Sequence, residues 1–246
     1  MENKINLRKG TLYLIPNLIA ETDPDQVLPA YVIRIAKKVH TIFAEDIRNA
    51  RRFIKKLNPS AHIDHLTFYP IGKHTKPIEI YKQLSGVPEG TDAGIISEAG
   101  LPCIADPGAI LVAQAHKMGL RVVPLSGPSS ITLALIASGF TGQSFVFHGY
   151  LPINKKDRGQ KIRELEKNAY RLDQTQIFME APFRNNQLIQ DILSSCSGNT
   201  LMCIAANITS SAEYIKTKSI SEWKNSVPDL HKQPVIYLLY KSTDYF

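Results

Sequence analysis

The strongest candidate for a ligand-binding loop follows an apolar run in the first half of the chain. Residues 95–102 read Ile-Ile-Ser-Glu-Ala-Gly-Leu-Pro, so a strand of the buried type ends in a turn of small residues. In open α/β sheets, ligands bind beyond the carboxyl ends of strands, and Gly100 would let the backbone approach a ligand closely. An ordinary turn between a strand and a helix explains the same residues equally well.

A second candidate combines small hydroxyl residues with the start of an apolar helix. Residues 126–130 read Ser-Gly-Pro-Ser-Ser and precede the apolar run 131–138. The hydroxyls could cap the free N–H groups of that helix, which is the commoner use of such residues. The same N-terminus could hold an anionic or polar group of a ligand.

A third candidate places a carboxylate and a guanidinium around a proline. In residues 178–184, Glu180 and Arg184 flank Pro182 where a predicted strand gives way to a helix. They could form a structural ion pair, or they could face a cleft between the two halves of the chain. The opening strand, followed by Pro16 and Asn17, is a weaker fourth candidate.

The sequence lacks the motifs of several other kinds of ligand-binding and catalytic site. The sequence has no GxGxxG fingerprint, no GxxxxGK[ST] phosphate loop and no GxSxG elbow. His62 and His65 have no third partner at a ligand spacing, so we predict no metal site. The three cysteines, Cys103, Cys196 and Cys203, form no CxxC pair. We therefore expect small buried apolar residues rather than disulfides or a zinc site.

The elements that would position these residues alternate along the chain. Strands are predicted for residues 11–16, 40–45, 94–98, 121–125, 144–150, 174–180, 201–207 and 234–240. Helices are predicted for residues 45–57, 107–118 and 183–196, the second opened by Asp106-Pro107 and closed by Gly119. This alternation predicts an α/β fold with covered sheets. A boundary near residues 123–127 divides the chain into domains 1–123 and 124–246.

Composition narrows the class of protein. The 246 residues are 43% hydrophobic and 21% charged, as in ordinary folded proteins. No apolar run reaches the roughly 18 residues of a membrane span, and residues 1–10 lack the apolar stretch of a secretory signal. We therefore expect a cytoplasmic protein without a membrane partner.

The formal net charge of +7 fits an anionic partner such as nucleic acid, although many basic proteins bind none. Two basic runs could contact phosphates or be solvated helix faces. They comprise Arg48, Arg51, Arg52, Lys55 and Lys56, and then Lys155, Lys156, Arg158, Lys161 and Arg163.

Five segments, in this order, resemble one family closely. Residues 43–48 match its AEDTR element, and residues 97–108 resemble its SDAGTPxISDPG loop. Residues 124–130 resemble PxPGPSA, residues 147–152 resemble FxGFLP, and residues 178–184 resemble FYESPHR. The family is the small-subunit ribosomal RNA 2′-O-ribose cytidine methyltransferases. It belongs to the tetrapyrrole-methylase-type (class III) S-adenosylmethionine-dependent methyltransferases.

The resemblance implies a fold, a cofactor and partners. The expected fold is tetrapyrrole-methylase-like, with two α/β domains and a cofactor cleft between them, assembled as a homodimer. The expected reaction transfers a methyl group from S-adenosylmethionine to a ribose 2′-hydroxyl of 16S-type RNA in the small ribosomal subunit. Carried over by position, the cofactor contacts are Pro16, Ser97, Ala99, Gly100, Leu101, Pro102, Ser129 and Ser130.

The same resemblance places Glu180 and Arg184 near the substrate. A ribose hydroxyl is a weak nucleophile while protonated, so a general base would help. Glu98 and Glu180 are the candidates, with His74 a weaker one, and Arg184 completes the expected catalytic set. Glu45 and Asp46 could instead organise the cleft.

Four segments depart from the family pattern and keep two rival functions open. The segment that corresponds to the family's TPIGNL loop lacks the glycine, since Asn17 follows Pro16 directly. In the segment that resembles SDAGTPxISDPG, the acidic residue is Glu98 rather than aspartate. Residues 205–213 lack the arginine and lysine of ARELTKxHE, and Gln233-Pro234 stands where the family has GE. The rivals are a non-catalytic descendant that binds S-adenosylmethionine or RNA, and a methyltransferase of a small tetrapyrrole-like acceptor.

Overall fold

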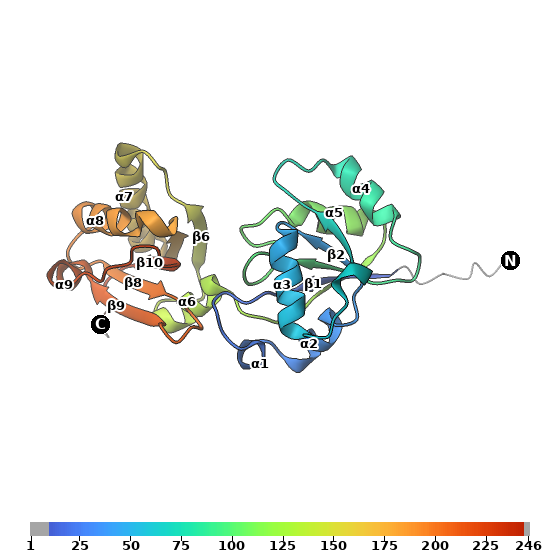
Figure 1. Ribbon diagram of the computed structural model, residues 1–246. Helices are drawn as coiled ribbons and strands as arrows, with labels where there is room; N and C mark the ends of the chain where they lie inside the picture. The colour runs from blue at the N-terminus through green and yellow to red at the C-terminus, as the bar shows by residue number, and fades with distance from the viewer. Residues whose placement is uncertain (1–9, 244–246) are drawn as a thin grey trace. The chain divides into compact units, whose positions relative to one another are not determined.

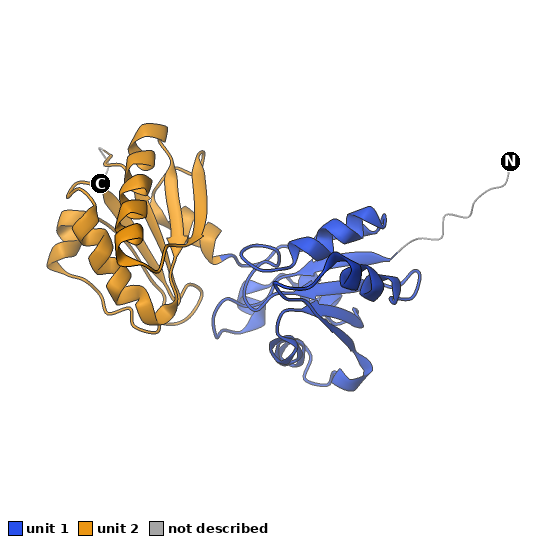
Figure 2. Ribbon diagram, turned by 90° about the horizontal axis from the view of Figure 1, so that it is seen from above, with its two compact units in different colours: residues 1–129 blue, residues 130–246 orange. Residues whose placement is uncertain are grey.

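The computed structural model describes residues 10–243, which form two compact units divided between Ser129 and Ser130 (Figure 2). The predicted boundary at 123/124 falls earlier than this division. Residues just beyond it still belong to the first unit, because Pro124 pairs with Leu14 and the Leu125 N–H donates to the Leu14 carbonyl. The polar N-terminal segment that led us to expect a cytoplasmic protein lies outside the described residues, except for Gly10.

The first unit, unit 1, is built on a five-stranded sheet in which every strand is parallel to its neighbours. The strands are β1 (Thr11–Ile15), β2 (Thr41–Ala44), β3 (Thr67–Pro70), β4 (Ala93–Ile96) and β5 (Arg121–Pro124), in the order β3-β2-β4-β1-β5. β2 and β4 are buried along their whole length, as expected when both faces of a sheet are covered. All five carboxyl ends lie at one side of the sheet, here called the carboxyl edge of unit 1.

Helices cover both faces of this sheet (Figure 1). One face carries α1 (Pro24–Val27), α2 (Ala30–Ala36) and α3 (Ile47–Leu57), and the other carries α4 (Pro77–Ser85) and α5 (Ala109–Lys117). A short 3₁₀ helix, η1 (Ile63–His65), precedes β3. Ile42 packs with Ile54 of α3, whereas its neighbour Phe43 packs with Leu111 of α5. Successive side chains of a strand point to opposite faces, so one strand supplies both cores.

The second unit, unit 2, has a mixed sheet. Its strands are β6 (Phe145–Tyr150), β7 (Thr175–Met179), β8 (Leu201–Ala206), β9 (Tyr214–Ser219) and β10 (Val235–Tyr240), in the order β6-β7-β10-β8-β9. Only β6 and β7 pair in parallel, and the other described pairs are antiparallel. The fold therefore changes from a purely parallel sheet in unit 1 to a mostly antiparallel one in unit 2.

Helices also cover both faces of the second sheet. The helices are α6 (Ser130–Ser138), α7 (Lys155–Leu172), η2 (Pro182–Arg184), α8 (Asn185–Ser195) and α9 (Ile220–Asn225). Leu165 of α7, Ile192 of α8 and Trp223 of α9 share one core with Tyr237 of β10. α6 packs against β8, β9 and β10, and its Ser138 carbonyl accepts a 2.7 Å hydrogen bond from Thr217.

The predicted α/β architecture is confirmed, but two strands were missed. β3 and β9 are both edge strands, and edge strands carry fewer apolar residues than central ones. In β9, Lys216 and Lys218 interrupt the apolar pattern, and lysines on an edge also discourage pairing with other chains.

The predicted start of α5 is also wrong. The helix begins at Ala109 rather than at Pro107, because Asp106 is used inside the preceding loop. Its Oδ1 atom accepts hydrogen bonds from the N–H groups of Cys103 (2.8 Å) and Gly108 (2.9 Å). The predicted end is confirmed, since Gly119 has a φ of 70° and donates to the His116 carbonyl.

The cysteines differ from one another in exposure. Cys196 and Cys203 are buried, and burial raises their thiol pKa values to about 12 and about 11. Cys103 is only half-buried, which corrects the prediction for that residue, although burial followed by the charge of Asp106 still raises its pKa to about 11. No helix in the described part of the chain has the length and apolar composition needed to cross a bilayer.

Candidate functional site

The loops predicted to bind a ligand meet at the carboxyl edge of unit 1. Because the sheet is parallel and β1 lies between β4 and β5, the segments that follow these three strands leave the sheet side by side. These segments begin at Pro16, Ser97 and Leu125. Crevices beyond the carboxyl ends of parallel strands are the usual ligand sites of such sheets.

Asn17 fastens the first of these segments to the second. Its backbone N–H donates to the Gly100 carbonyl at 2.9 Å, and its side-chain amide donates to the carbonyls of Ser97 (2.9 Å) and Glu98 (3.1 Å). The amide oxygen accepts from the Leu18 N–H at 2.8 Å. Asn17 is 4% exposed, so these bonds satisfy a buried amide. The residue that departs from the family's glycine-containing loop is thus the link between the loops.

The loop after β4 directs its carbonyl groups inward. The buried Ser97 hydroxyl donates to the carbonyls of Ala99 (3.2 Å) and Gly100 (3.0 Å). The hydrogen bonds within residues 10–243 leave the N–H groups of Ala99, Gly100 and Leu101 without a protein partner. Backbone N–H groups require partners, so successive free ones mark a place where an acceptor group of a ligand can bind.

Gly100 is required by the fold of the loops themselves. Its φ is +68°, and a Cβ atom there would lie 3.0 Å from Ile19 Cγ2 and 3.1 Å from the Pro128 carbonyl oxygen. A side chain at this position would therefore strain the backbone and separate the 97–102 segment from the 126–129 segment.

The third segment packs on the first in the same way. A Cβ atom on Gly127 would lie 2.3 Å from both Cβ and Cγ of Pro16, so only glycine fits against that proline. The segments after β1, β4 and β5 therefore touch through Pro16, Gly100, Gly127 and Pro128. The sequence suggested each segment separately, and the structure brings them together.

The remainder of the loop after β4 holds strained backbone. Cys103 and Ala105 have φ values of 70° and 61°, although neither is glycine. Non-glycine residues in this region cost on the order of 1–3 kcal/mol and persist where surrounding contacts fix them. Here Asp106 supplies those contacts, and Gly108 leaves no room for a Cβ beside Ile95 and Cys103. Such strain is concentrated at functional sites.

Carboxylates gather beside these loops. Glu98 is exposed at the end of β4, and its carbonyl accepts from the side chains of Asn17 and Asn49. Burial, followed by the negative charges of Glu98 and Asp106, raises the pKa of Glu45, and Lys73 opposes that shift. Glu45 therefore joins Glu98 as a candidate proton acceptor. Asp46 instead caps α3, accepting from the N–H groups of Arg48 and Asn49.

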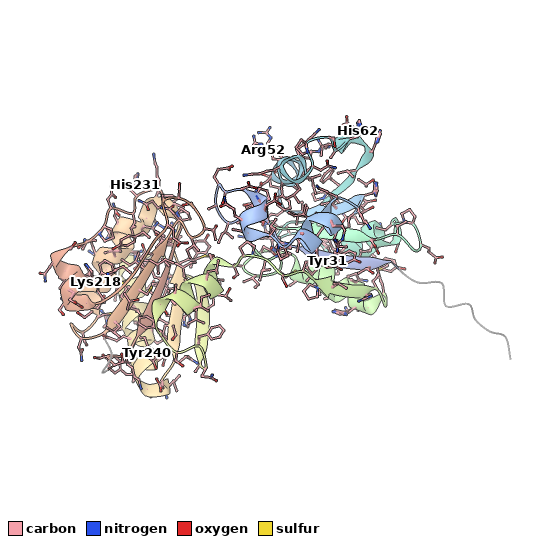
Figure 3. All side chains as sticks on the ribbon, turned by 90° about the horizontal axis from the view of Figure 1, so that it is seen from below. Tyr31, Arg52, His62, Lys218, His231 and Tyr240 are labelled. Carbon is pink, nitrogen blue, oxygen red and sulfur yellow. The ribbon has the colours of Figure 1, made fainter. Side chains whose placement is uncertain are left out.

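A hollow of about 340 Å³ adjoins the same edge. It is lined by Asn17 and Glu98 from the loops and by Asn49, Arg52 and Lys56 from α3. Arg52 projects from the surface of α3 (Figure 3). Lys56 forms a 2.6 Å ion pair with Glu21, whose side chain is 96% exposed. Such an exposed pair contributes little to stability, so Lys56 remains available to other anions.

The other cations of α3 divide into two groups. Arg51 lies over the Phe68 ring and Lys55 donates to the Pro59 carbonyl, so both are used within the unit. Arg48 and Arg52 have no ion-pair partner among the described residues. Arg48, Arg52 and Lys56 follow one another at a spacing of four and share one face, here called the α3 stripe.

In unit 2, Glu180 and Arg184 form a largely buried ion pair. Glu180 Oε1 accepts from Arg184 Nε (2.9 Å) and Nη2 (2.6 Å) and from the Ala181 N–H (2.6 Å). The Glu180 side chain is 1% exposed and that of Arg184 is 29% exposed. The pair is therefore more than a surface salt bridge, because removing the arginine would leave a buried carboxylate.

The elements around this pair are held by amide hydrogen bonds. The buried Asn185 amide donates to the carbonyls of Pro182, Leu230 and Gln233, at 3.2, 3.3 and 2.7 Å. Its oxygen accepts from the Tyr237 hydroxyl at 3.1 Å. Burial, followed by the charge of Glu180, raises the pKa of Tyr237. The polar groups of this edge are largely satisfied by one another.

The segment that lacks the family's arginine and lysine is also strained. Asn207 and Thr209 have φ values of 52° and 70°, and the buried Thr209 hydroxyl finds no hydrogen-bond partner among residues 10–243. The Thr209 N–H is bound by Glu213 at 2.8 Å, and the Asn207 amide donates to Gln233 at 2.7 Å. The segment therefore keeps a fixed shape without the family's two cations.

The comparisons with known proteins agree with this arrangement. The profile described as Tetrapyrrole (Corrin/Porphyrin) Methylases matches residues 26–224. The chain belongs to the tetrapyrrole methylase family. The chain is therefore a methyltransferase with S-adenosylmethionine as its methyl donor.

Several similar proteins carry the name Ribosomal RNA small subunit methyltransferase I. The protein from Halalkalibacterium halodurans is 33% identical over 215 residues, covering 87% of this chain and 70% of that protein. The protein from Bacillus subtilis is 31% identical, covering 88% and 70%. Among solved structures, the methyltransferase CobJ has a TM-score of 0.60 at 15% identity, covering 95% of this chain and 94% of CobJ. It shows the fold alone.

The carboxyl edge of unit 1 fits the cofactor of a tetrapyrrole methylase. S-adenosylmethionine carries a carboxylate and other hydrogen-bond acceptors, and the free N–H groups of residues 99–101 can bind such groups. Of the predicted cofactor residues, Pro16, Ser97, Ala99, Gly100, Leu101, Pro102 and Ser129 lie in unit 1. Ser130 begins α6 of unit 2, and the Ser97 side chain is used inside the loop.

The roles of two contributors to this tetrapyrrole methylase site were not predicted. Asn17 was named only in the weak fourth candidate and as a departure from the family pattern, and Asn49 was not singled out. An asparagine directly after a buried strand was the available signal, because such a side chain needs several hydrogen-bond partners when it is buried. His62 and His65 stack on each other, and the described residues contain no group of three metal-ligating side chains.

Proposed function

We propose that this methyltransferase transfers the methyl group of S-adenosylmethionine to a ribose 2′-hydroxyl of RNA in the small ribosomal subunit. The observation that carries the proposal is the meeting of three loops with free backbone N–H groups at the carboxyl edge of unit 1. The names of relatives that are 31–33% identical support the choice of substrate. A cytoplasmic location and a homodimeric state are part of the proposal.

We assign cofactor binding to the loops of the carboxyl edge and to the start of α6. The residues are Pro16, Ser97, Ala99, Gly100, Leu101, Pro102, Ser129 and Ser130. When bound, the cofactor supplies a methyl group on a sulfonium. The protein must hold the acceptor oxygen in line with that methyl group and exclude water.

Glu98 is the proposed proton acceptor. It is exposed at the carboxyl edge, beside the loop whose N–H groups are free, so its carboxylate can reach a bound hydroxyl. Glu180 is less suited to accept a proton, since its Oε1 atom already accepts three hydrogen bonds. We assign Glu180 and Arg184 to positioning the acceptor side of the site.

The α3 stripe is the proposed contact for the RNA strand near the acceptor nucleotide. Arg48 and Arg52 have no ion-pair partner in the described chain, and the hollow joins Arg52 to Glu98. Phosphate groups are the natural partners of unpaired arginines in a protein of net charge +7. A small neutral acceptor would have no use for this stripe.

The decisive experiment measures methyl transfer to small subunits isolated from cells that lack this protein. We expect one 2′-O-methyl site to appear, and we expect Glu98→Gln to lower the single-turnover rate by roughly 10²-fold while cofactor affinity stays the same. Glu89→Gln is the matched control, because Glu89 is equally exposed but precedes β4 at the opposite end of the strand.

Two results would contradict the proposal. Cofactor binding without methyl transfer to subunits or their RNA would identify a non-catalytic binding protein. Full activity of Glu98→Gln would move the proton acceptor to Glu45, where Glu45→Gln can be measured in the same assay.

A further inference from the structure

The basic surface that the sequence suggested at the start of α7 does not exist as expected. Arg158 is buried, 5% exposed, and pairs with Asp191 at 2.5 Å, while also donating to the carbonyls of Pro152 and Ile153. Lys161 pairs with Glu164 at 2.8 Å. The first turns of α7 therefore fasten the preceding loop. Among the described residues, the other three cations of the run, Lys155, Lys156 and Arg163, are exposed and form no ion pair.

The last cation of that run, Arg163, instead joins two further cations along the second half of α7. Arg163, Lys167 and Arg171 are exposed and follow one another at a spacing of four, so they share one face, here called the α7 stripe. The stripe spans about 12 Å of helix. Within residues 10–243, none of the three forms an ion pair.

The carboxylates of α7 offset only part of the charge of this stripe. Glu164 is paired with Lys161. Glu166 lies beside the stripe, but its Oε1 atom accepts from the Ser197 N–H at 2.7 Å and from the Thr200 hydroxyl. Like charges at a spacing of four destabilise an isolated helix, so this arrangement does not serve the helix itself.

The stripe borders a shallow hollow with the groups that RNA uses. The hollow has a volume of about 680 Å³ and is lined by Arg163, Glu166, Lys167, Tyr170 and Arg171 of α7 and by Ser197 and Asn199, so three cations face one carboxylate. Tyr170 is 41% exposed, and its hydroxyl is within 3.3 Å of the Thr200 hydroxyl, which fixes the ring. A fixed exposed aromatic ring beside cations can stack a base while the cations bind phosphates.

We propose that the α7 stripe and its hollow bind the sugar-phosphate backbone of a single-stranded segment of the ribosomal RNA. This site is separate from the α3 stripe, which lies on unit 1. The proposal rests on the proposed function, because it takes ribosomal RNA as the substrate. It adds a second contact that recognises the particle rather than the acceptor nucleotide.

The test compares two triple variants of the full-length protein. The first is Arg163→Gln, Lys167→Gln and Arg171→Gln, and the control is Lys37→Gln, Lys38→Gln and Lys82→Gln, three exposed lysines of unit 1. Both remove the same charge. The affinity for small-subunit RNA is measured between low and moderate salt.

The stripe variant should bind at least about tenfold more weakly, and its slope of log affinity against log salt should fall by about 2–3. The control variant should show a much smaller decrease in affinity and in the salt slope. Cofactor affinity should stay at the wild-type value in both variants. Thermal stability should not fall in the stripe variant, because repulsion along α7 is relieved.

A second variant pair tests the hollow. Tyr170→Leu should weaken binding to single-stranded RNA by about tenfold through the loss of stacking, and Tyr170→Phe should restore it. Equal losses in both would assign the effect to the hydroxyl and would contradict the stacking role.

The failures are distinguishable. If the wild-type protein binds RNA and the stripe variant matches the control in affinity and slope, the α7 stripe is a solvated face and this inference is wrong. If the wild-type protein binds cofactor but no RNA, the proposed function fails and the inference fails with it. A preference of the stripe for anionic vesicles over RNA would also overturn it.

Discussion

The carboxyl edge of the unit 1 sheet and the Glu180 region of unit 2 use buried polar groups in opposite ways. In unit 1, Asn17 and Ser97 bind carbonyl groups of one loop and leave its N–H groups free. In unit 2, Glu180 and Asn185 bind side chains and carbonyls of neighbouring segments. Unit 1 thus presents unpaired backbone to a ligand, whereas the unit 2 region is largely satisfied within the protein.

This difference shows that two segments can both match a family motif and still use their polar groups differently. Residues 97–108 and 178–184 both resemble elements of the same family, yet the first leaves three successive backbone N–H groups free, whereas the buried carboxylate of the second accepts three hydrogen bonds within the protein. Two motifs of one family can therefore differ in whether their polar groups are free or already bonded within the protein. Changing one buried polar group in each unit tests this distinction.

The largest effect is expected from Arg184→Ala in unit 2. Removing the arginine leaves the Glu180 carboxylate buried, which should cost about 2–4 kcal/mol, less than for a fully buried pair because Arg184 is partly exposed. Trp223 is the single tryptophan and is buried in unit 2, so its fluorescence reports the unfolding of this unit. Methyl transfer should fall by roughly 10²-fold at unchanged cofactor affinity.

A double variant separates stability from positioning. Glu180→Gln with Arg184→Met leaves no buried charge, so most of the stability should return. If the pair positions the acceptor, the methyl-transfer rate should stay low in this variant. Recovery of both stability and activity would reduce Glu180 and Arg184 to a purely structural pair.

Asn17→Ala in unit 1 should have the next largest effect. It leaves the buried carbonyls of Ser97 and Glu98 without their donor, which should cost about 1–3 kcal/mol. Cofactor affinity should fall at least tenfold, because the loop with the free N–H groups loses its anchor. Calorimetry with S-adenosylmethionine measures the affinity, and hydrogen exchange measures the stability of unit 1.

Asn185→Ala is the matched control in unit 2. The Asn185 amide is hydrogen-bonded through both its nitrogen and its oxygen, as that of Asn17 is, and Asn185 is also buried, so its loss should destabilise unit 2 by at least a similar amount. Cofactor affinity should be nearly unchanged at temperatures where the variant is folded. An equal loss of affinity in both variants would mean that the two regions do not differ in the way described.

The sequence predicted the strands better than it predicted the contacts that join the loops. The eight predicted strands correspond to observed strands because each has a continuous or alternating apolar run. The two edge strands were missed, since Thr67–Pro70 is short and half-exposed and Tyr214–Ser219 carries two lysines. Short edge strands depend on pairing with a neighbour, and pairing is not visible in a local pattern.

The segments that form the site could be predicted from the sequence, but the contacts between them could not. The small-residue loops were found from their composition, but the positions that join them are set by tertiary contacts. Asn17 binds residues eighty positions away, and Gly127 is required by Pro16. The sequence likewise suggests a surface position for Arg158, yet this residue of α7 is buried and binds Asp191 of α8. Partners this distant cannot be identified from spacing along the chain.

A smaller effect should distinguish the two basic stripes, one in each unit. Neutralising Arg48 and Arg52 to glutamine should weaken the binding of small-subunit RNA by about tenfold and lower the salt slope by about 2. Methyl transfer to a short RNA containing the acceptor nucleotide should fall as well. The α7 triple variant should spare that short substrate and weaken the binding of the whole small-subunit RNA and of the intact subunit. If both variants affect both substrates equally, the stripes do not divide the RNA between them.

The smallest effect is a pH dependence of opposite sign in the two units. In unit 2, burial lowers the pKa of His148 below its usual 6.5, so the unfolded chain binds the proton first as pH falls. Stability of unit 2 should be complete above pH 6.5 and should decrease as pH falls from 6.5 toward the lowered pKa. In unit 1, the pKa of Glu45 is raised from 4.5, so its protonation should favour the folded state as pH falls toward 4.5.

Denaturant unfolding of His148→Gln, followed through Trp223 between pH 5 and 7, should show a flatter dependence of stability on pH than the wild type. The reason is that glutamine can keep a hydrogen bond to Gln176 without titrating. An unchanged slope in this variant would assign the acid sensitivity of unit 2 to another group.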